Sequence, residues 1–348
     1  MLGPEHEKGA LPMRGSLQDL GICVGRLSPG PTDSIVDVPG VKVGHVTLAR
    51  GDGALRVGAG PVRTGVTVVV PPGEVGPLPA AVHVINGYGK SVGLLQVAEL
   101  GQLESPIFLT NTLSVAPVLQ GYLEHLRARG RFHPGQSRNV VVGECNDGYL
   151  NDLWGFAVKP EHAVAALAAA SSAPPTQGSV GAGTGMAGFG HKGGIGTASR
   201  RHPDGHVIGV LVLLNCGESE DLVTFPGRPR AGGPSDVPDG SIIIVVATNA
   251  GVDRWDLARV ARRASHGLAR VGGHSAPGSG DVVVAVDVGG PSGATPRDLD
   301  PLFQAVAETT EAAIWNALLT ADTVVGRDGH VLKALPTEWA PGTPMRPS

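Results

Sequence analysis

The stretch that decides the fold is Asp239-Gly240-Ser241-Ile242-Ile243-Ile244-Val245-Val246-Ala247-Thr248. From Ile242 to Ala247 every side chain is apolar and most are β-branched, a pattern that predicts a strand buried on both faces. The preceding segment, residues 218–239, is polar and contains four prolines, which is typical of an exposed loop. A serine therefore stands where an exposed loop enters a core strand, directly after a glycine.

This junction has two interpretations. Glycine before Ser241 leaves the preceding carbonyl sterically open and permits unusual backbone angles. Such a site suits a serine that attacks its own upstream peptide bond and then acts as a nucleophile at a new N-terminus. The plainer interpretation is a serine that starts a strand after a turn glycine. On these residues alone the plainer interpretation is favoured.

The composition describes a globular chain and excludes several partners. The chain has 348 residues, enough for one large or two medium domains, and 41% of them are hydrophobic. The 53 glycines and 29 prolines predict many tight loops between short elements. Aromatic residues make up only 4% and the net charge is −4 without a long basic run, so we expect no nucleic-acid partner.

The cysteines and the apolar segments predict a cytoplasmic protein without a membrane partner. Cys23, Cys145 and Cys216 are widely spaced and form no CxxC motif, which fits a reducing compartment better than a disulfide framework. Residues 1–14 show no signal-peptide pattern. The longest apolar runs, 207–214 and 242–247, are too short to span a bilayer as a helix.

The hydrophobic pattern predicts stacked α and β layers. Residues 33–46 alternate around Pro39-Gly40 and predict a hairpin. Further strands are predicted at 66–70, 81–85, 107–109, 139–142, 207–214 and 281–287. Helices are predicted at 115–126, at 161–170, after a cap at Asp253 and after a cap at Asp298. Residues 1–30 are expected to be a loosely ordered N-terminal extension, and 31–348 a single catalytic domain.

The sequence patterns that resemble cofactor-binding motifs lack the flanking elements that such motifs require, and no zinc-binding pattern is present. Gly183-Thr184-Gly185-Met186-Ala187-Gly188 fits G-x-G-x-x-G, but no strand precedes it and no helix pattern follows. Gly89-Lys90-Ser91 lacks the first glycine of a phosphate-binding loop, because Val84 occupies that place. The twelve histidines include no H-E-x-x-H motif and no zinc spacing with cysteine. We therefore expect no cofactor and no metal.

Several ordered motifs resemble the β-peptidyl aminopeptidase and L-aminopeptidase/D-Ala-esterase/amidase family, the DmpA type. The resemblance covers roughly residues 33–336. Besides Gly240-Ser241 and its strand, the matching stretches are Asp37-Val38-Pro39-Gly40-Val41-Lys42-Val43-Gly44-His45, Asn86-Gly87-Tyr88-Gly89, Leu109-Thr110-Asn111-Thr112, Gly181-Ala182-Gly183-Thr184-Gly185-Met186, Lys192-Gly193-Gly194-Ile195-Gly196-Thr197-Ala198-Ser199-Arg200 and the helix over 302–318.

The resemblance implies a fold and an activity. The fold is α/β, a four-layer α/β/β/α sandwich shared with ornithine acetyltransferase and self-cleaved into an α chain, 1–240, and a β chain, 241–348. The activity is that of a serine aminopeptidase or amidase that releases small N-terminal L-, D- or β-amino acids from peptides, amides or esters. The alternative is an acyltransferase of the ornithine acetyltransferase type, but its nucleophile is threonine. A non-catalytic scaffold is a third possibility. The resemblance also implies a homo-oligomer, a tetramer of αβ heterodimers.

The resemblance assigns four catalytic positions. Ser241 is similar to the nucleophile, with cleavage between Gly240 and Ser241, and its freed α-amine can serve as the base. Asn215, at the end of the 207–214 strand, resembles the oxyanion donor. Ser279 and Asp281 resemble a pair that orients the nucleophile, although the family often has Glu at the acid position. From the residues alone, a strand-end turn residue is the favoured interpretation of Asn215, and an ordinary turn is as good an interpretation of Gly278-Ser279-Gly280-Asp281 as a functional pair.

The resemblance also assigns substrate-binding positions. Glu144 is similar to the carboxylate that pairs with the free amino group of the substrate. Some family members carry an aromatic residue where Asn146 stands. The aromatic residue nearest in sequence is Tyr149, so both Asn146 and Tyr149 are expected at the substrate pocket.

Overall fold

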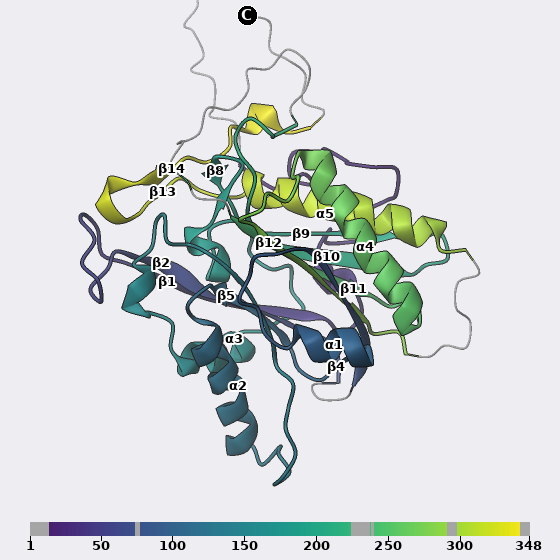
Figure 1. Ribbon diagram of the computed structural model, residues 1–348. Helices are drawn as coiled ribbons and strands as arrows, with labels where there is room; N and C mark the ends of the chain where they lie inside the picture. The colour runs from purple at the N-terminus through teal and green to yellow at the C-terminus, as the bar shows by residue number, and fades with distance from the viewer. Residues whose placement is uncertain (1–13, 74–76, 224–236, 238–239, 291–297, 342–348) are drawn as a thin grey trace, which may run out of the picture.

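The computed structural model describes residues 14–73, 77–223, 237, 240–290 and 298–341 (Figure 1). Two sheets hold most of the strands. The four-stranded sheet has the order β1-β2-β5-β6, with β1 Lys42–Arg50, β2 Val62–Val70, β5 Ile107–Asn111 and β6 Val141–Cys145. The six-stranded sheet has the order β4-β3-β12-β11-β10-β9, with β4 Gln102–Leu103, β3 Leu78–Gly87, β12 Gly280–Asp287, β11 Ser241–Thr248, β10 Val207–Asn215 and β9 Gly194–Arg201.

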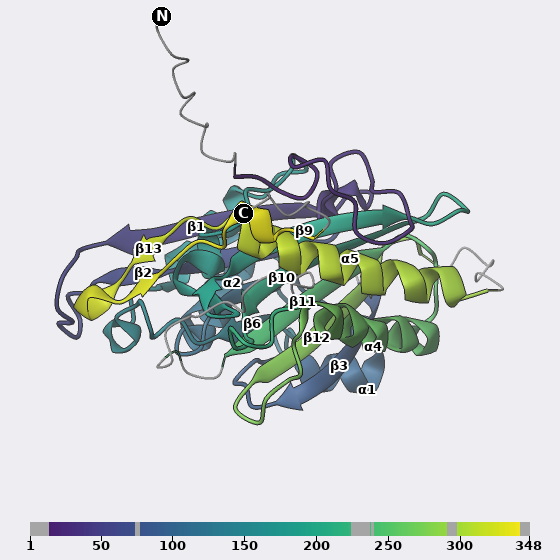
Figure 2. The same ribbon diagram turned by 90° about the horizontal axis from the view of Figure 1, so that it is seen from above.

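Helices cover the outer face of each sheet. Helices α4 (Arg254–Val271) and α5 (Asp300–Leu319) run side by side over the six-stranded sheet (Figure 2). Helices α2 (Val115–Ala128) and α3 (Pro160–Ala168) pack on the four-stranded sheet, and the short α1 (Leu94–Leu100) lies beside β3 and β4. The predicted four-layer α/β/β/α sandwich is confirmed.

The central strand β11 contributes to two cores at once. Ile242, Ile244 and Val246 pack in the core between the six-stranded sheet and helices α4 and α5. Ile243, Val245 and Ala247 pack in the core between the two sheets. Because successive side chains of a strand point to opposite faces, a continuous apolar run is what a strand between two cores requires.

Most predicted elements are present, and one prediction is wrong. Asp253 caps α4, because its carboxylate accepts the N–H groups of Trp255 and Asp256. Before α5, the N–H of Asp300 donates to the Asp298 carboxylate, although Leu299 is the capping residue. The hairpin at 33–46 is absent, since Ile35–Asp37 forms a 3₁₀ helix and only Lys42–Arg50 is a strand.

The described part of the N-terminal extension is packed rather than loose. Leu17 is buried, and its N–H donates to Asn316 Oδ1 on α5. The N–H groups of Arg26 and Leu27 both donate to the Glu308 carboxylate on the same helix. Within the described residues, no helix is long and apolar enough to cross a membrane.

Candidate active site

Three strand ends meet at one edge of the six-stranded sheet. β11 begins at Ser241, between antiparallel β10 and parallel β12. Ser241 pairs with Asn215, the last residue of β10, and with Gly280, the first residue of β12. The topology therefore brings the predicted nucleophile, the predicted oxyanion donor and the Ser279–Asp281 turn to the same place.

The hydroxyl of Ser241 is buried and held by a backbone donor. The N–H of Gly280 donates to Ser241 Oγ at 3.0 Å. The Cys145 thiol, on β6, donates to the carbonyl oxygen of Ser241 at 3.4 Å. Burial raises the pKa of Cys145 well above its ordinary value, so this cysteine remains a neutral thiol and does not compete as a nucleophile.

The predicted pair Ser279 and Asp281 is formed beside Ser241. Ser279 Oγ donates to Asp281 Oδ1 at 2.5 Å, and the same oxygen accepts the N–H of Ile242 at 3.1 Å. Asp281 is buried, and its Oδ2 has no hydrogen-bond partner among the described residues. One carboxylate oxygen thus remains available next to the N-terminal end of β11. Asn86 supports this turn, because its amide donates to the carbonyl of Ser279.

The orientation of the Asn215 side chain is fixed from both ends. Its Oδ1 accepts the N–H of Ala187 at 2.8 Å, and its Nδ2 donates to the carbonyl of Asn146 at 3.0 Å. Because a backbone N–H can only donate, the oxygen of the amide must face Ala187. Nδ2 carries a second hydrogen, which the Asn146 bond leaves available.

Gly240 lies directly against Asn215. A Cβ atom at position 240 would lie 1.4 Å from the Asn215 carbonyl oxygen and 3.1 Å from Asn215 Nδ2. Only glycine fits at this distance. The amide that could stabilise an oxyanion is therefore adjacent to the residue whose peptide bond Ser241 is expected to attack.

Glu144 lies on the other side of Ser241 from Asn215. Its Oε1 accepts the N–H of Lys90 at 2.6 Å. A Cβ atom at Gly89 would lie 3.3 Å from that oxygen and 3.8 Å from the Cα of Gly280, which places Glu144 close to Ser241. Glu144 is buried, and among the described residues it forms no ion pair. A buried carboxylate without a counter-charge favours the binding of a cation.

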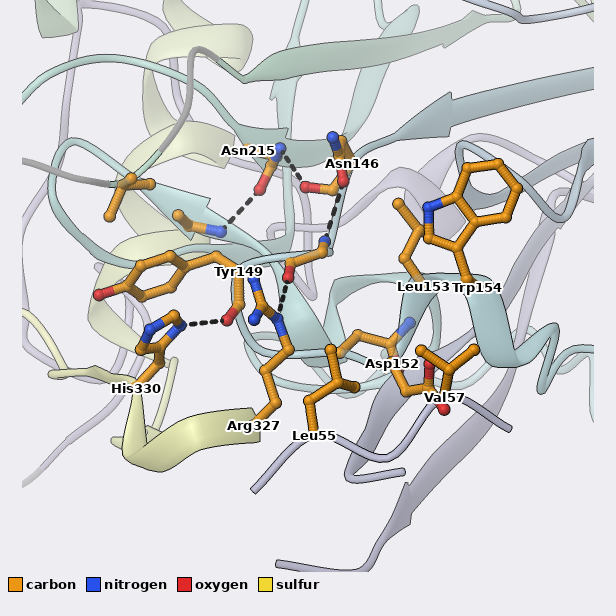
Figure 3. Close-up of a pocket in the computed structure, with 14 residues that line it drawn as sticks. Leu55, Val57, Asn146, Tyr149, Asp152, Leu153, Trp154, Asn215, Arg327 and His330 are labelled. Atoms are coloured by element: carbon orange, nitrogen blue, oxygen red, sulfur yellow. Dashed lines mark hydrogen bonds between the residues drawn. The ribbon is translucent and has the colours of Figure 1, made fainter. Parts of the chain in front are cut away.

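A cavity of about 480 Å³ opens beside Asn215 (Figure 3). Asn146 and Asn215 lie side by side on its wall, and Tyr149 stacks on His330 with a ring-centroid distance of 4.5 Å. His330 Nδ1 donates to the carbonyl of Tyr149, so the ring is held in place. The remaining wall includes the apolar residues Leu55, Val57, Leu153 and Trp154 and the polar residues Asn151, Asp152 and Arg327. Both predicted pocket residues, Asn146 and Tyr149, line this cavity.

Two buried ionisable side chains lie under this site. Asp147 follows Asn146, and burial raises its pKa to about 7 against hydrogen bonds from Thr64 and Asn151. Lys192 is also fully buried, and burial lowers its pKa to about 7, while the negative charges of Asp147 and Asp322 act in the opposite direction. Neither residue was predicted from the sequence as part of the site.

Asp147→Asn is expected to remove part of the pH dependence of stability. Because the folded pKa of Asp147 lies above the ordinary 3.8, its stabilisation is fully present below about pH 4 and is lost as the pH rises to about 7. The free energy involved is on the order of a few kcal/mol. The thermal unfolding midpoint of the variant minus that of wild type should therefore be several degrees larger at about pH 8 than at about pH 4.

The contribution of Lys192 has the opposite sense. Its folded pKa is depressed, so stability increases as the pH rises above about 7. Because the Asp147 charge opposes this depression, its removal lowers the Lys192 pKa further and adds to the relative rise of the variant. Asp322→Asn, at an exposed position, serves as the control. Parallel midpoint curves for wild type and Asp147→Asn would contradict the assignment.

Sequence reasoning missed the groups of the site that act through the backbone. These are the N–H groups of Ala187, Gly280 and Lys90, which hold Asn215, Ser241 and Glu144 in turn. A backbone donor has no residue-type signature, so the sequence carries no direct signal for these groups. Among the described residues, no group of three or more His, Cys, Asp or Glu side chains is placed to hold a metal ion.

Comparisons with known proteins identify relatives of this chain among the aminopeptidases. The BapA beta-peptidyl aminopeptidase of Sphingosinicella microcystinivorans is 38% identical over 361 residues, covering 92% of this chain and 89% of that protein. The beta-aminopeptidase of a Burkholderia species has a solved structure with TM-score 0.84 and 37% identity, covering 96% of this chain and 100% of the other.

A second solved structure identifies the fold. It is the L-aminopeptidase D-Ala-esterase/amidase of Ochrobactrum anthropi, described as a variant of the Ntn hydrolase fold, with TM-score 0.81, 30% identity and coverage of 92% and 96%. The sequence itself matches the profile of peptidase family S58 over residues 33–332. The chain therefore belongs to peptidase family S58 and has the Ntn hydrolase fold of its serine aminopeptidases.

Proposed function

We propose that the chain is a self-processing aminopeptidase and amidase whose nucleophile is Ser241. The observation that carries the proposal is the position of Ser241 at the start of β11, with Asn215 on one neighbouring strand and Asp281 on the other. The beta-peptidyl aminopeptidase and L-aminopeptidase D-Ala-esterase/amidase activities named for the relatives support the same reaction class. They do not favour the acyltransferase alternative.

Maturation begins with the Gly240–Ser241 bond. Ser241 Oγ attacks the carbonyl carbon of Gly240, a C–O bond forms, and the C–N bond breaks to release the α-amine of Ser241. Water then hydrolyses the ester, leaving an α chain of residues 1–240 and a β chain of residues 241–348. The adjacent Asn215 amide is suited to stabilise the oxyanion of this step.

Turnover uses the new N-terminus. The α-amine has an ordinary pKa near 8 (roughly 7.7–8.0), so it is partly neutral at working pH and can take the proton of Ser241 Oγ without a histidine. Asp281 is proposed to orient the amine through its Oδ2 atom and to hold Ser279 through Oδ1. Ser241 then forms an acyl-enzyme with the first residue of the substrate as the scissile bond breaks, and the α-ammonium returns the proton to the departing amine or alcohol. Water then hydrolyses the ester and releases the first residue.

The substrate is proposed to be a short peptide, amide or ester with a free amino group. Glu144 pairs with the ammonium group, which supplies the missing counter-charge. The part of the substrate after the scissile bond occupies the cavity beside Asn215, where Asn146 and Tyr149 contact it. The first residue is a small L-, D- or β-amino acid, as the activities named for the relatives suggest.

The assembly and location are also proposals. Residues 31–348 form one catalytic domain, and the mature heterodimers associate into a tetramer. We place the protein in the cytoplasm, because its three cysteines are all unpaired and two of them are buried in the fold. Size-exclusion chromatography with light scattering measures the assembly directly.

A panel of p-nitroanilides of L-Ala, D-Ala and β-Ala, each free or N-acetylated, tests the function and the role of Glu144. Free substrates should be hydrolysed, and acetylated ones should not, because an amide cannot form the charged pair with Glu144. Glu144→Gln should raise KM strongly, with maturation largely intact, because the Gly240–Ser241 cleavage involves no free substrate ammonium.

Glu104→Gln is the matched control, because Glu104 is a half-buried glutamate outside the site that accepts hydrogen bonds from Gln96 and Asn139. It should leave KM unchanged. Equal hydrolysis of free and acetylated substrates would refute the role of Glu144. Absence of hydrolysis for every member of the panel by the matured wild type would refute the proposed function.

A further inference from the structure

The buried Lys192 has no role in the chemistry proposed above. It lies in the short strand β8 (His191–Lys192), which pairs with β7 (Ala187–Gly188), and its register partner is Ala187. Ala187 is the residue whose N–H holds Asn215 Oδ1. A fully buried ammonium costs free energy unless each of its hydrogens has a partner. Its presence opposite Ala187, which holds the Asn215 side chain, therefore calls for a physical reason.

The Lys192 ammonium bridges two backbone carbonyls, one before and one after Ala187 in the chain. Lys192 Nζ donates to the carbonyl of Gly183 at 2.8 Å and to the carbonyl of Gly193 at 2.8 Å. These two residues lie on either side of Ala187 in the chain. The N–H of Gly193 also donates to the carbonyl of Met186, the residue before Ala187. The direction of the Ala187 N–H is therefore set by contacts that converge on Lys192.

The second hydrogen bond of the Asn215 side chain is made to the residue that precedes a buried aspartate. Asn215 Nδ2 donates to the carbonyl of Asn146, and the next residue is the fully buried Asp147. Asp147 Oδ1 accepts from Asn151, and Oδ2 has no hydrogen-bond partner among the described residues. Of the acidic groups that act on Lys192, Asp147 has the largest effect, followed by Asp322.

We infer that Lys192 is a positioning residue for the oxyanion site, which fixes the Ala187 N–H and through it the Asn215 amide, with Asp147 as its counter-charge. The inference rests on the proposed function. The N–H that holds Asn215 Oδ1 belongs to the register partner of Lys192, and the carbonyl that accepts from Asn215 Nδ2 belongs to the residue before Asp147. Removal of the ammonium leaves the Gly183 carbonyl with only the Met186 N–H, takes from the Gly193 carbonyl its hydrogen bond to Lys192, and permits the Ala187 loop to rearrange.

The inference predicts a specific kinetic signature. Asn215 acts on the charge that develops in the transition state, so its misplacement lowers kcat and leaves KM nearly unchanged. Displacement of a catalytic group by about 1 Å costs on the order of a hundredfold. Lys192→Met, which keeps the length and removes the charge, should lower kcat by roughly tenfold to a hundredfold with KM within about twofold of wild type.

A double-mutant cycle separates positioning from general stability. Rates are expressed per matured chain, counted by the amount of new Ser241 N-terminus. If Lys192 acts through Asn215, the double variant Lys192→Met/Asn215→Ala should be no slower than Asn215→Ala alone. Lys192→Arg, which keeps the charge, should recover part of the loss. Lys333→Met is the matched control, because Lys333 is exposed and it is the backbone carbonyl of Lys333 that accepts the Lys192 N–H, and its kcat should be unchanged.

Hydrogen exchange at the Ala187 amide tests the same inference without turnover. In the uncleaved Ser241→Ala chain, Lys192→Met should accelerate exchange at Ala187, and Lys333→Met should not. If Lys192→Met does not fold, Asp147→Asn serves in its place and should also accelerate exchange. Unchanged exchange, an unchanged kcat, or losses that simply add to that of Asn215→Ala would each overturn the inference. Wild type that hydrolyses no substrate refutes the proposed function instead, and the exchange result still decides the role of Lys192.

Discussion

Ser241→Ala is expected to run as one uncut and inactive chain of 35.4 kDa on a denaturing gel. Wild type should show two bands, of 240 and 108 residues, roughly 24 and 11 kDa by length. Alanine has no β-oxygen, so neither the ester at Gly240 nor the acyl-enzyme can form. The small wild-type band should begin Ser-Ile-Ile-Ile in N-terminal sequencing. Activity of the variant should fall to the background of the assay.

The two wild-type fragments should elute together under native conditions. β11 lies between β10 and β12, and its side chains belong to two cores, so the smaller chain cannot leave without exposing both. Ser265→Ala, on α4, where the Ser265 hydroxyl makes an exposed hydrogen bond to the carbonyl of Arg262, should mature normally. Ser241→Cys should restore some cleavage, because a thiol at the same position can attack Gly240. An uncleaved wild-type chain that still hydrolyses the p-nitroanilides would refute the N-terminal-nucleophile mechanism.

The sequence was sufficient for the fold wherever one hydrophobic pattern dominated. The run from Ile242 to Ala247 predicted a strand buried on both faces, and the helical spacing from Val115 predicted α2. β9, at Gly194–Arg201, was not predicted, because glycines interrupt its apolar pattern. Gly196 is required there for packing, since a Cβ atom would lie 2.0 Å from the carbonyl of Ala313 on α5.

The hairpin prediction failed because of contacts with residues distant in sequence. The N–H of Ile35 donates to Thr197 Oγ1, and Ser199 donates its N–H to Asp33 Oδ1 and its hydroxyl to Asp37 Oδ2. These hydrogen bonds wind the segment into a turn that alternation of apolar residues cannot reveal. Local pattern and tertiary contact disagree at this segment, and the tertiary contact prevails.

Candidate site residues could be chosen from the sequence where a chemically distinctive side chain stands at the end of a predicted strand. Ser241, Asn215 and Asp281 each stand at such an end, and family resemblance supplied their roles. The structure brings them together, and it places Glu144 beside them. Lys192 and Asp147 were not predicted, because a lone lysine in a glycine-rich segment and an aspartate in a turn are usually exposed. The folded structure, and not the local sequence, buries Lys192 and Asp147 next to the two residues that hold the Asn215 side chain.

Asn215→Ala is expected to lower kcat by about 10²–10³ with little change in KM. The Nδ2 group has one hydrogen bonded to Asn146 and a second available beside Gly240, so its loss removes a donor from the transition state alone. Maturation should slow as well, since the Gly240 carbonyl uses the same donor, and rates are therefore counted per matured chain. Asn249→Ala is the matched control, because Asn249 holds the Val207 N–H at the opposite end of β10. Its kcat should stay at the wild-type value while its thermal stability falls, and a loss of only a few-fold in Asn215→Ala would reduce Asn215 to a turn residue.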